Sequence, residues 1–93
     1  MKQNLEILKR TDSFGVVRYC NQNEKLHRED APAVEYNDGT KFWYIHGKLH
    51  REDGPAVEYP NGTKHWYLKG KGHSEESYYR EVKVIKLKRA LNL

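Results

Sequence analysis

The tetrapeptide His-Arg-Glu-Asp occurs twice in this chain, at residues 27–30 and 50–53. Histidine and carboxylate side chains can ligate zinc or exchange protons with a substrate, so each copy has residue types that a metal site or a hydrolase needs. A site that is needed once has no reason to recur in each copy of a repeat, whereas a linker must be rebuilt every time. Arg28 and Arg51 also neutralise their acidic neighbours. We therefore interpret both copies as linkers and predict no catalytic residue, no metal and no cofactor. A small metalloprotein or hydrolase is the alternative.

The cysteine and the glycines also give no indication of an enzyme active site. The single cysteine, Cys20, excludes an intramolecular disulfide, and its place in a predicted strand favours a small buried hydrophobic residue. The glycines follow the repeat and belong to turns, so no glycine-rich phosphate loop is predicted. The N-terminal ten residues do not resemble a signal peptide, and no segment has the roughly 20 apolar residues of a membrane span. We expect a cytoplasmic protein that is not an enzyme and has no membrane partner.

The tetrapeptide is part of a longer internal repeat. Leu26 and Leu49 begin successive copies, so the period is 23 residues (49 − 26). Six of the 23 aligned positions differ between residues 26–48 and 49–71, which leaves 17 identities. Such a repeat indicates one structural unit that stacks on its neighbours, with atypical units at both ends.

Each copy of the repeat predicts a β-hairpin. Asp38-Gly39 and Asn61-Gly62 are dipeptides typical of tight turns between strands. They separate alternating segments that we expect to be strands near 33–37 and 41–46, and near 56–59 and 64–69. Gly47 and Gly70 are expected to end the second strands. Alternation with period two divides the side chains between two faces, and we expect the face with Trp43, Ile45, Trp66 and Leu68 to form the core.

The segments outside the repeats are predicted to cap the stack. Residues 5–8 and 16–20 read as another hairpin around the turn sequence TDSFG. Ser74, followed by Glu75 and Glu76, is typical of a helix start. Helical spacing would place Tyr78, Val82 and Ile85 on one side, although residues 82–88 also alternate as a strand would. We therefore expect one mainly β domain, a meander of stacked hairpins with a C-terminal helix. Its parts are a cap at 1–25, repeats at 26–48 and 49–71, and a second cap at 72–93.

The charge is concentrated in the last third of the chain. The formal net charge is +4, and residues 64–93 hold eight basic and three acidic residues, so this segment has a net charge of +5. Basic residues mixed with aromatic ones suit an acidic protein surface or a nucleic acid. We predict that a partner binds to Tyr44, Lys64, His65, Tyr67, Lys69, Lys71, Arg80, Lys83, Lys86, Lys88 and Arg89.

The repeat resembles that of a known family. The string KLHREDGPAVEY, followed by GTK, an aromatic pair and a closing GK, is similar to the MORN-like repeats of bacteriophage and large DNA virus proteins. The resemblance covers residues 25–73. It implies hairpins stacked into an elongated, twisted sheet that serves as a binding scaffold.

Three function classes follow from these observations. The first is a non-enzymatic binding protein that, if viral, binds and blocks a host protein such as a defence complex in the host cytoplasm. The second is a nucleic-acid-binding module that uses the basic C-terminal third. The third is the metalloprotein or hydrolase considered above. Exposed sheet edges also allow a homodimer.

Overall fold

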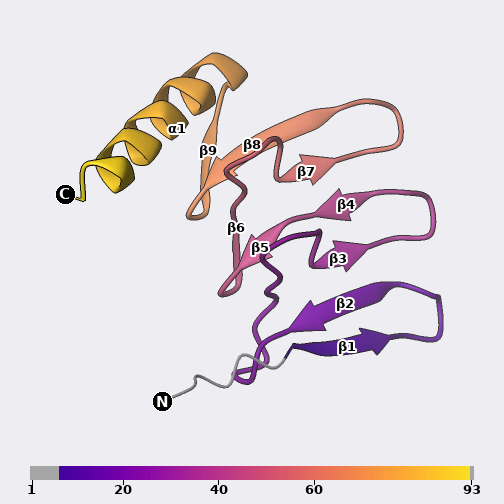
Figure 1. Cartoon of the computed structure of the whole chain (residues 1–93). Helices are drawn as coiled ribbons and strands as arrows, with labels where there is room; N and C mark the ends of the chain where they lie inside the picture. The colour runs from indigo at the N-terminus through magenta and orange to yellow at the C-terminus, as the bar shows by residue number, and fades with distance from the viewer. Residues whose placement is uncertain (1–6, 93) are drawn as a thin grey trace.

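The chain is mainly β-structure with one helix at its C-terminal end, as predicted. The computed structural model describes residues 7–92, and these form nine short strands followed by α1 (Glu75–Ala90) (Figure 1). The tail is therefore a helix and not a strand. The strands are β1 (Leu8–Thr11), β2 (Val17–Cys20), β3 (Val34–Glu35), β4 (Lys41–Phe42), β5 (Tyr44–Ile45), β6 (Lys48–Leu49), β7 (Val57–Glu58), β8 (Lys64–Leu68) and β9 (Lys71–His73).

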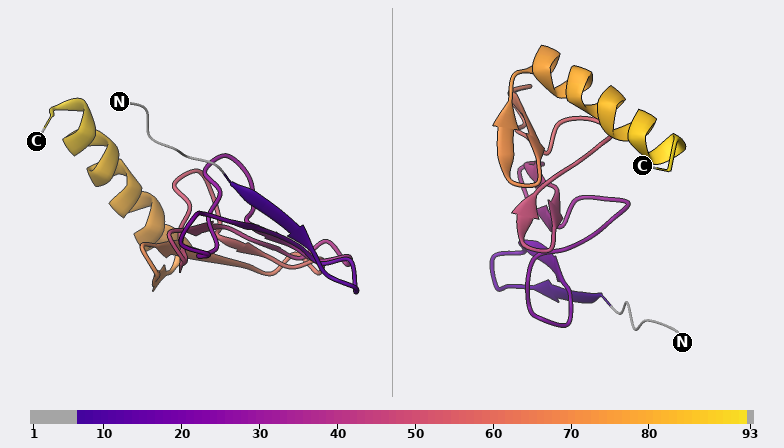
Figure 2. Two further views of the ribbon diagram at one scale, coloured as in Figure 1. Left: turned by 90° about the horizontal axis from the view of Figure 1, so that it is seen from below. Right: turned by 90° about the vertical axis from the view of Figure 1, so that its left-hand side faces the viewer.

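The strands form a thin antiparallel plate. The main sheet has the order β1-β2-β3-β4-β7-β8-β9, and β5 pairs with β6 in a separate two-stranded ribbon. Three hairpins, β1–β2, β3–β4 and β7–β8, lie one above the other in this sheet (Figure 1). The molecule measures 45 × 44 × 16 Å. The helix projects to one side of the sheet, as the edge-on view in Figure 2 shows.

The first hairpin surrounds the predicted turn sequence, but its first strand begins late. β1 starts at Leu8, whereas the predicted strand spans 5–8, and residues 5 and 6 lie outside the described part. Leu8 pairs with Cys20 and Thr11 pairs with Val17. Asp12 closes the turn because its carboxylate accepts hydrogen bonds from the backbone N–H groups of Phe14 and Val16.

The second strand is continuous in the second repeat, as predicted near 64–69, but it differs from the prediction in the first repeat. The segment expected as one strand at 41–46 is interrupted at Trp43, whose N–H donates to the carbonyl of Ala56 and whose carbonyl accepts from the N–H of His50. Trp43 therefore joins its own hairpin to the segment that follows it. The chain also does not leave the sheet at Gly47, because a tight turn leads directly into β6.

Each repeat contains two turns of different type. In the predicted turn, Gly39 has φ 98° and the N–H of Tyr36 donates to the carbonyl of Thr40, which is a three-residue loop with glycine in the left-handed region. In the second turn, His46 and Gly47 have φ values of 50° and 82° and link β5 to β6. Two successive residues with positive φ between paired strands form a type I′ turn. Lys69 and Gly70 repeat this turn between β8 and β9, with φ values of 52° and 85°.

The predicted core face is only partly correct. Trp43 and Trp66 are half-buried, while Val34 and Val57 on the opposite face are 4% and 3% exposed. Val34 and Val57 lie opposite Phe42, which places all three on one face of the sheet. Buried side chains therefore lie on both faces of the sheet, with Val34 and Val57 on one face and Leu68 on the other. Cys20 is buried, as predicted.

The C-terminal helix begins at the predicted cap and covers the last hairpin. The Ser74 hydroxyl accepts a hydrogen bond from the N–H of Ser77, and Glu75 and Glu76 occupy the first turn. These acidic residues suit the positive end of the helix dipole. The predicted apolar side is confirmed, since Tyr78 and Val82 are buried together with Leu68, and Trp66 and Ile85 pack against them.

Candidate interaction surfaces

The two HRED segments act as linkers, and their histidines connect successive hairpins. Nδ1 of His27 accepts a hydrogen bond from the backbone N–H of His46, at 2.9 Å. Nδ1 of His50 does the same with the N–H of Lys69, at 2.8 Å. Both donors, His46 and Lys69, are the first of the two positive-φ residues in their type I′ turns. Each histidine therefore links its own linker to the type I′ turn of the same repeat, 19 residues later.

The arginines of the linkers cover aromatic rings of the preceding hairpin. The guanidinium carbon of Arg28 lies 3.8 Å from the centre of the Tyr19 ring, and that of Arg51 lies 3.8 Å from the Trp43 ring. Each arginine also donates to the carbonyl of the proline four residues later. The Arg51 cation over the ring therefore covers part of the Trp43 side chain.

Among residues 7–92, no group of three or more His, Cys, Asp and Glu side chains comes close enough to hold a metal ion. The carboxylates lie instead beside the histidines, with Glu29 3.5 Å from Nε2 of His27 and Glu52 3.2 Å from Nε2 of His50. The histidine, the arginine and the glutamate each make the same contact in both copies, as a repeated linker would, whereas of the two aspartates only Asp53 makes an ion pair with another described residue.

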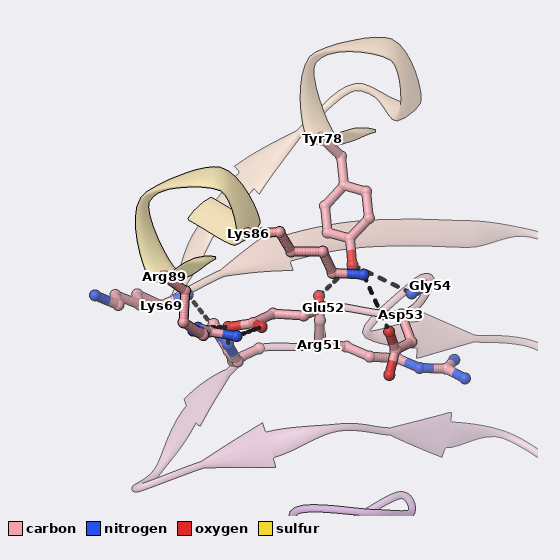
Figure 3. Close-up of polar contacts among 9 residues, drawn as sticks. Arg51, Glu52, Asp53, Gly54, Lys69, Tyr78, Lys86 and Arg89 are labelled. Carbon is pink, nitrogen blue, oxygen red and sulfur yellow. Dashed lines mark hydrogen bonds and ion pairs between the residues drawn. The ribbon is translucent and has the colours of Figure 1, made fainter. Parts of the chain in front are cut away.

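Two of the predicted partner-binding residues hold the helix onto the second linker (Figure 3). The Arg89 guanidinium donates to both carboxylate oxygens of Glu52, at 3.0 and 3.2 Å. These hydrogen bonds hold the pKa of Glu52 below its ordinary value. Lys86 approaches Asp53 at 3.7 Å. Both cations therefore have intramolecular partners, which reduces the free charge of the C-terminal third.

Tyr78 provides the buried part of the same attachment. Its hydroxyl donates to the carbonyl of Arg51 and accepts from the N–H of Gly54 at 3.2 Å (Figure 3). The Tyr78 residue is 0% exposed, and burial raises the pKa of its hydroxyl. Sequence reasoning identified Tyr78 as apolar core but could not show this polar role, because the acceptor and donor are backbone groups.

The remaining predicted cations lie in three places. Lys64 stands at the end of a row of alternating charge, because Glu35 faces Lys41, Lys41 faces Glu58 and Glu58 faces Lys64 across neighbouring strands. Lys69 lies in the exposed turn between β8 and β9, and Lys71 is the first residue of β9. The exposed residues Arg80, Lys83 and Lys88 belong to α1, where Arg80 pairs with Glu76 at 3.7 Å.

Six aromatic residues form a continuous band on the sheet face opposite the tryptophans. The strand register places Phe42 and His65 on the face of Val57, and alternation adds the tyrosines two positions away. Neighbouring rings lie close: Phe42 is 5.8 Å from Tyr36 and 6.3 Å from Tyr59 between ring centres. We call this surface the aromatic face, and it consists of Tyr36, Phe42, Tyr44, Tyr59, His65 and Tyr67.

The aromatic face is open to solvent over much of its area. Tyr36 and Tyr59 are 42% and 39% exposed, and His65 is exposed as well. A groove of about 470 Å³ lies between the turns of the second and third hairpins, with Tyr36, Phe42 and Tyr59 in its wall. Burial, and then the neighbouring Tyr36 and Tyr67, raise the pKa of the Tyr44 hydroxyl. The helix and the linker arginines lie on the other face, against Trp66 and Trp43.

The structure thus brings Tyr44, His65 and Tyr67 together on one face and separates them from the cations of α1. Sequence reasoning did not assign Tyr36, Phe42 and Tyr59 to a binding surface. Their signal was available in the period-two alternation of both repeats, which puts them on the same face as Tyr44. These three residues carry no charge, so the basic pattern of residues 64–93 did not point to them.

Comparison of the chain with protein families, with curated proteins and with solved structures finds no match. The helix in residues 7–92 is too short and too polar to cross a membrane.

Proposed function

We propose that this chain is a non-enzymatic protein-binding module and that the aromatic face is its contact surface. The observation that carries the proposal is the continuous band of six partly exposed aromatic rings on a sheet face that the helix leaves open. Aromatic residues dominate the energetics of protein interfaces, because they bury a large area while losing little conformational freedom.

The charge of the aromatic face favours a protein partner over a nucleic acid. The register places Arg18 on this face, opposite Val34, and Arg18 pairs with Asp12 at 2.9 Å. Nucleic-acid binding draws most of its affinity from cations that neutralise phosphates, and this face offers few. The resemblance to MORN-like viral proteins supports a host protein as the partner, for example a component of a defence complex in the host cytoplasm.

A capture experiment with matched tyrosine variants tests the proposal. Tyr36→Ala combined with Tyr59→Ala removes the two most exposed tyrosines of the face, while Tyr79→Ala removes a tyrosine of similar exposure (45%) on the helix. We expect nuclease-treated host lysate to yield a protein that the wild type and Tyr79→Ala retain. The double variant should retain it at least about tenfold less. Circular dichroism checks that all three chains are folded. Equal retention by the double variant would refute the aromatic face as the contact surface.

A nucleic-acid-binding module is the second candidate, and the unpaired cations support it. Lys69, Lys71, Lys83 and Lys88 make no ion pair with another described residue. Here we expect retention on heparin, affinity that falls steeply with salt, and weaker binding after Lys83→Glu with Lys88→Glu. Capture that disappears after nuclease treatment would favour this candidate over the first.

A further inference from the structure

The two identical linkers lie in different surroundings. The helix covers the second linker, where the Glu52 side chain is 25% exposed. No helix within residues 7–92 covers the corresponding Glu29, whose side chain is 78% exposed. The burial of the residue before the linker proline differs in the same way. Gly54, before Pro55, is buried beneath Tyr78, whereas Ala31, before Pro32, is only half-buried.

The second linker shows how this tetrapeptide is recognised. Arg89 of α1 donates two hydrogen bonds to the Glu52 carboxylate, at 3.0 and 3.2 Å. Lys86, one helical turn earlier, approaches the Asp53 carboxylate at 3.7 Å. The paired guanidinium–carboxylate geometry is among the strongest charge-assisted contacts in proteins. The contacts come from positions 86 and 89, which lie on the same side of α1 as Tyr78 and Val82.

The first linker has the same prearranged groups. His27 is held by its hydrogen bond to the N–H of His46, its side chain is 7% exposed, and its Nε2 faces Glu29 at 3.5 Å. The stacking of Arg28 on Tyr19 fixes the backbone next to it. Beside these residues an open groove of about 640 Å³ is lined by Tyr19, His27, Arg28, Glu29, Asp30 and His46, among others.

The spacing of the repeats leaves room for a second helix. Successive linkers are separated by one hairpin, which is two strands or about 10 Å along the sheet. Packed helices have axes roughly 8–10 Å apart. A helix seated on the first linker in the manner of α1 would therefore lie in contact with α1 itself.

We propose that the first linker is a docking site for a basic α-helix of a separate protein, in which an arginine clamps Glu29 and a neighbouring cation faces Asp30. We expect a cationic partner because the two exposed side chains of the first tetrapeptide, Glu29 and Asp30, are both carboxylates. It lies apart from the aromatic face, so its test stands whether or not the aromatic face binds a partner.

A peptide with the sequence of residues 74–92 serves as the probe, since α1 is the helix known to fit this tetrapeptide. The peptide is titrated into the full chain, and backbone amide shifts are followed by NMR. We expect shifts at residues 27–30 and at His46, and at least about tenfold weaker binding to the Glu29→Gln chain, because one charge-assisted pair is lost. Glu76→Gln, at an 88% exposed glutamate on α1, is the matched control and should bind as the wild type does.

Four results would overturn the proposal. The first is no binding at millimolar peptide. The second is peptide binding that Glu29→Gln leaves unchanged, which would be seen if the peptide replaced α1 at Glu52 and did not bind to the first linker. The third comes from sedimentation of the chain alone: a dimer that Glu29→Gln abolishes would make a second copy, and not a separate protein, the occupant. Retained binding by a peptide with Arg89→Gln would contradict the arginine clamp itself.

Discussion

Removing the Tyr78 hydroxyl should strongly destabilise the fold while leaving its apolar packing in place. In Tyr78→Phe the ring keeps its contacts with Leu68 and Val82, but the carbonyl of Arg51 and the N–H of Gly54 lose their partner. Both groups lie beneath the ring, and the Gly54 residue is buried. Water therefore cannot readily replace the hydroxyl.

The expected size follows from these two hydrogen bonds. Each contributes about 0.5–1.5 kcal/mol net, and a buried group left unpaired costs more, about 1–3 kcal/mol. We expect Tyr78→Phe to lower the free energy of unfolding by about 2–3 kcal/mol. For a domain of this size each kcal/mol shifts the thermal midpoint by about 4–8 °C, so the midpoint should fall by about 8–24 °C.

Urea unfolding followed by tryptophan fluorescence provides the assay, since Trp66 packs against the cluster that contains Tyr78. Tyr79→Phe is the matched control, because the residue is 45% exposed and neighbours Tyr78 in the same helix. Its effect should stay within about 0.5 kcal/mol. If Tyr78→Phe costs no more than Tyr79→Phe, the hydroxyl does not anchor α1 to the linker.

Three further changes test other contacts. Because Arg89 lowers the pKa of Glu52 in the folded chain, this carboxylate stabilises the fold above the ordinary glutamate range. That contribution is lost as the pH falls through the folded pKa, so the wild type's advantage over Glu52→Gln in thermal midpoint should shrink on acidification; a constant advantage would contradict the ion pair. His46→Asn should raise the free energy of unfolding by a few tenths of a kcal/mol in urea titrations, since asparagine is favoured at this position of a type I′ turn, and a loss would contradict the turn assignment. Trp43→Ala should cost about 2–3 kcal/mol in the same titration, because the ring is half-buried beneath Arg51, and a cost below about 1 kcal/mol would mean that the stacking contributes little.

The sequence predicted the hairpins and the helix because their signals are local. Asp38-Gly39 and Asn61-Gly62 determine where the chain reverses, and Ser74 with two glutamates determines where the helix begins. These features depend on backbone preferences within a few residues. The helical side with Tyr78 and Val82 was predictable for the same reason.

The features that were missed depend on contacts between distant residues. His46 and Lys69 have no strong preference for positive φ, so their turns were not predicted, and β6 and β9 were not either. The core face was predicted only in part, because Val34 and Val57 are buried on the other face and the guanidinium of Arg51 lies over Trp43. The ion pair between Glu52 and Arg89, which are 37 residues apart, has no sequence signal beyond opposite charge.

The histidine hydrogen bonds have a consequence for how such a chain can change in evolution. Each bond joins a linker to the type I′ turn of the same repeat and reaches no further, so a repeat can make this contact wherever it stands in the row. An in-frame duplication of residues 26–48 would bring its own turns, strands and linker, and it would fit between existing units without compensating substitutions. The helix would still close the last unit, while the band of aromatic rings would lengthen by one hairpin. Gene duplication could thus adjust the length of the binding surface in whole steps.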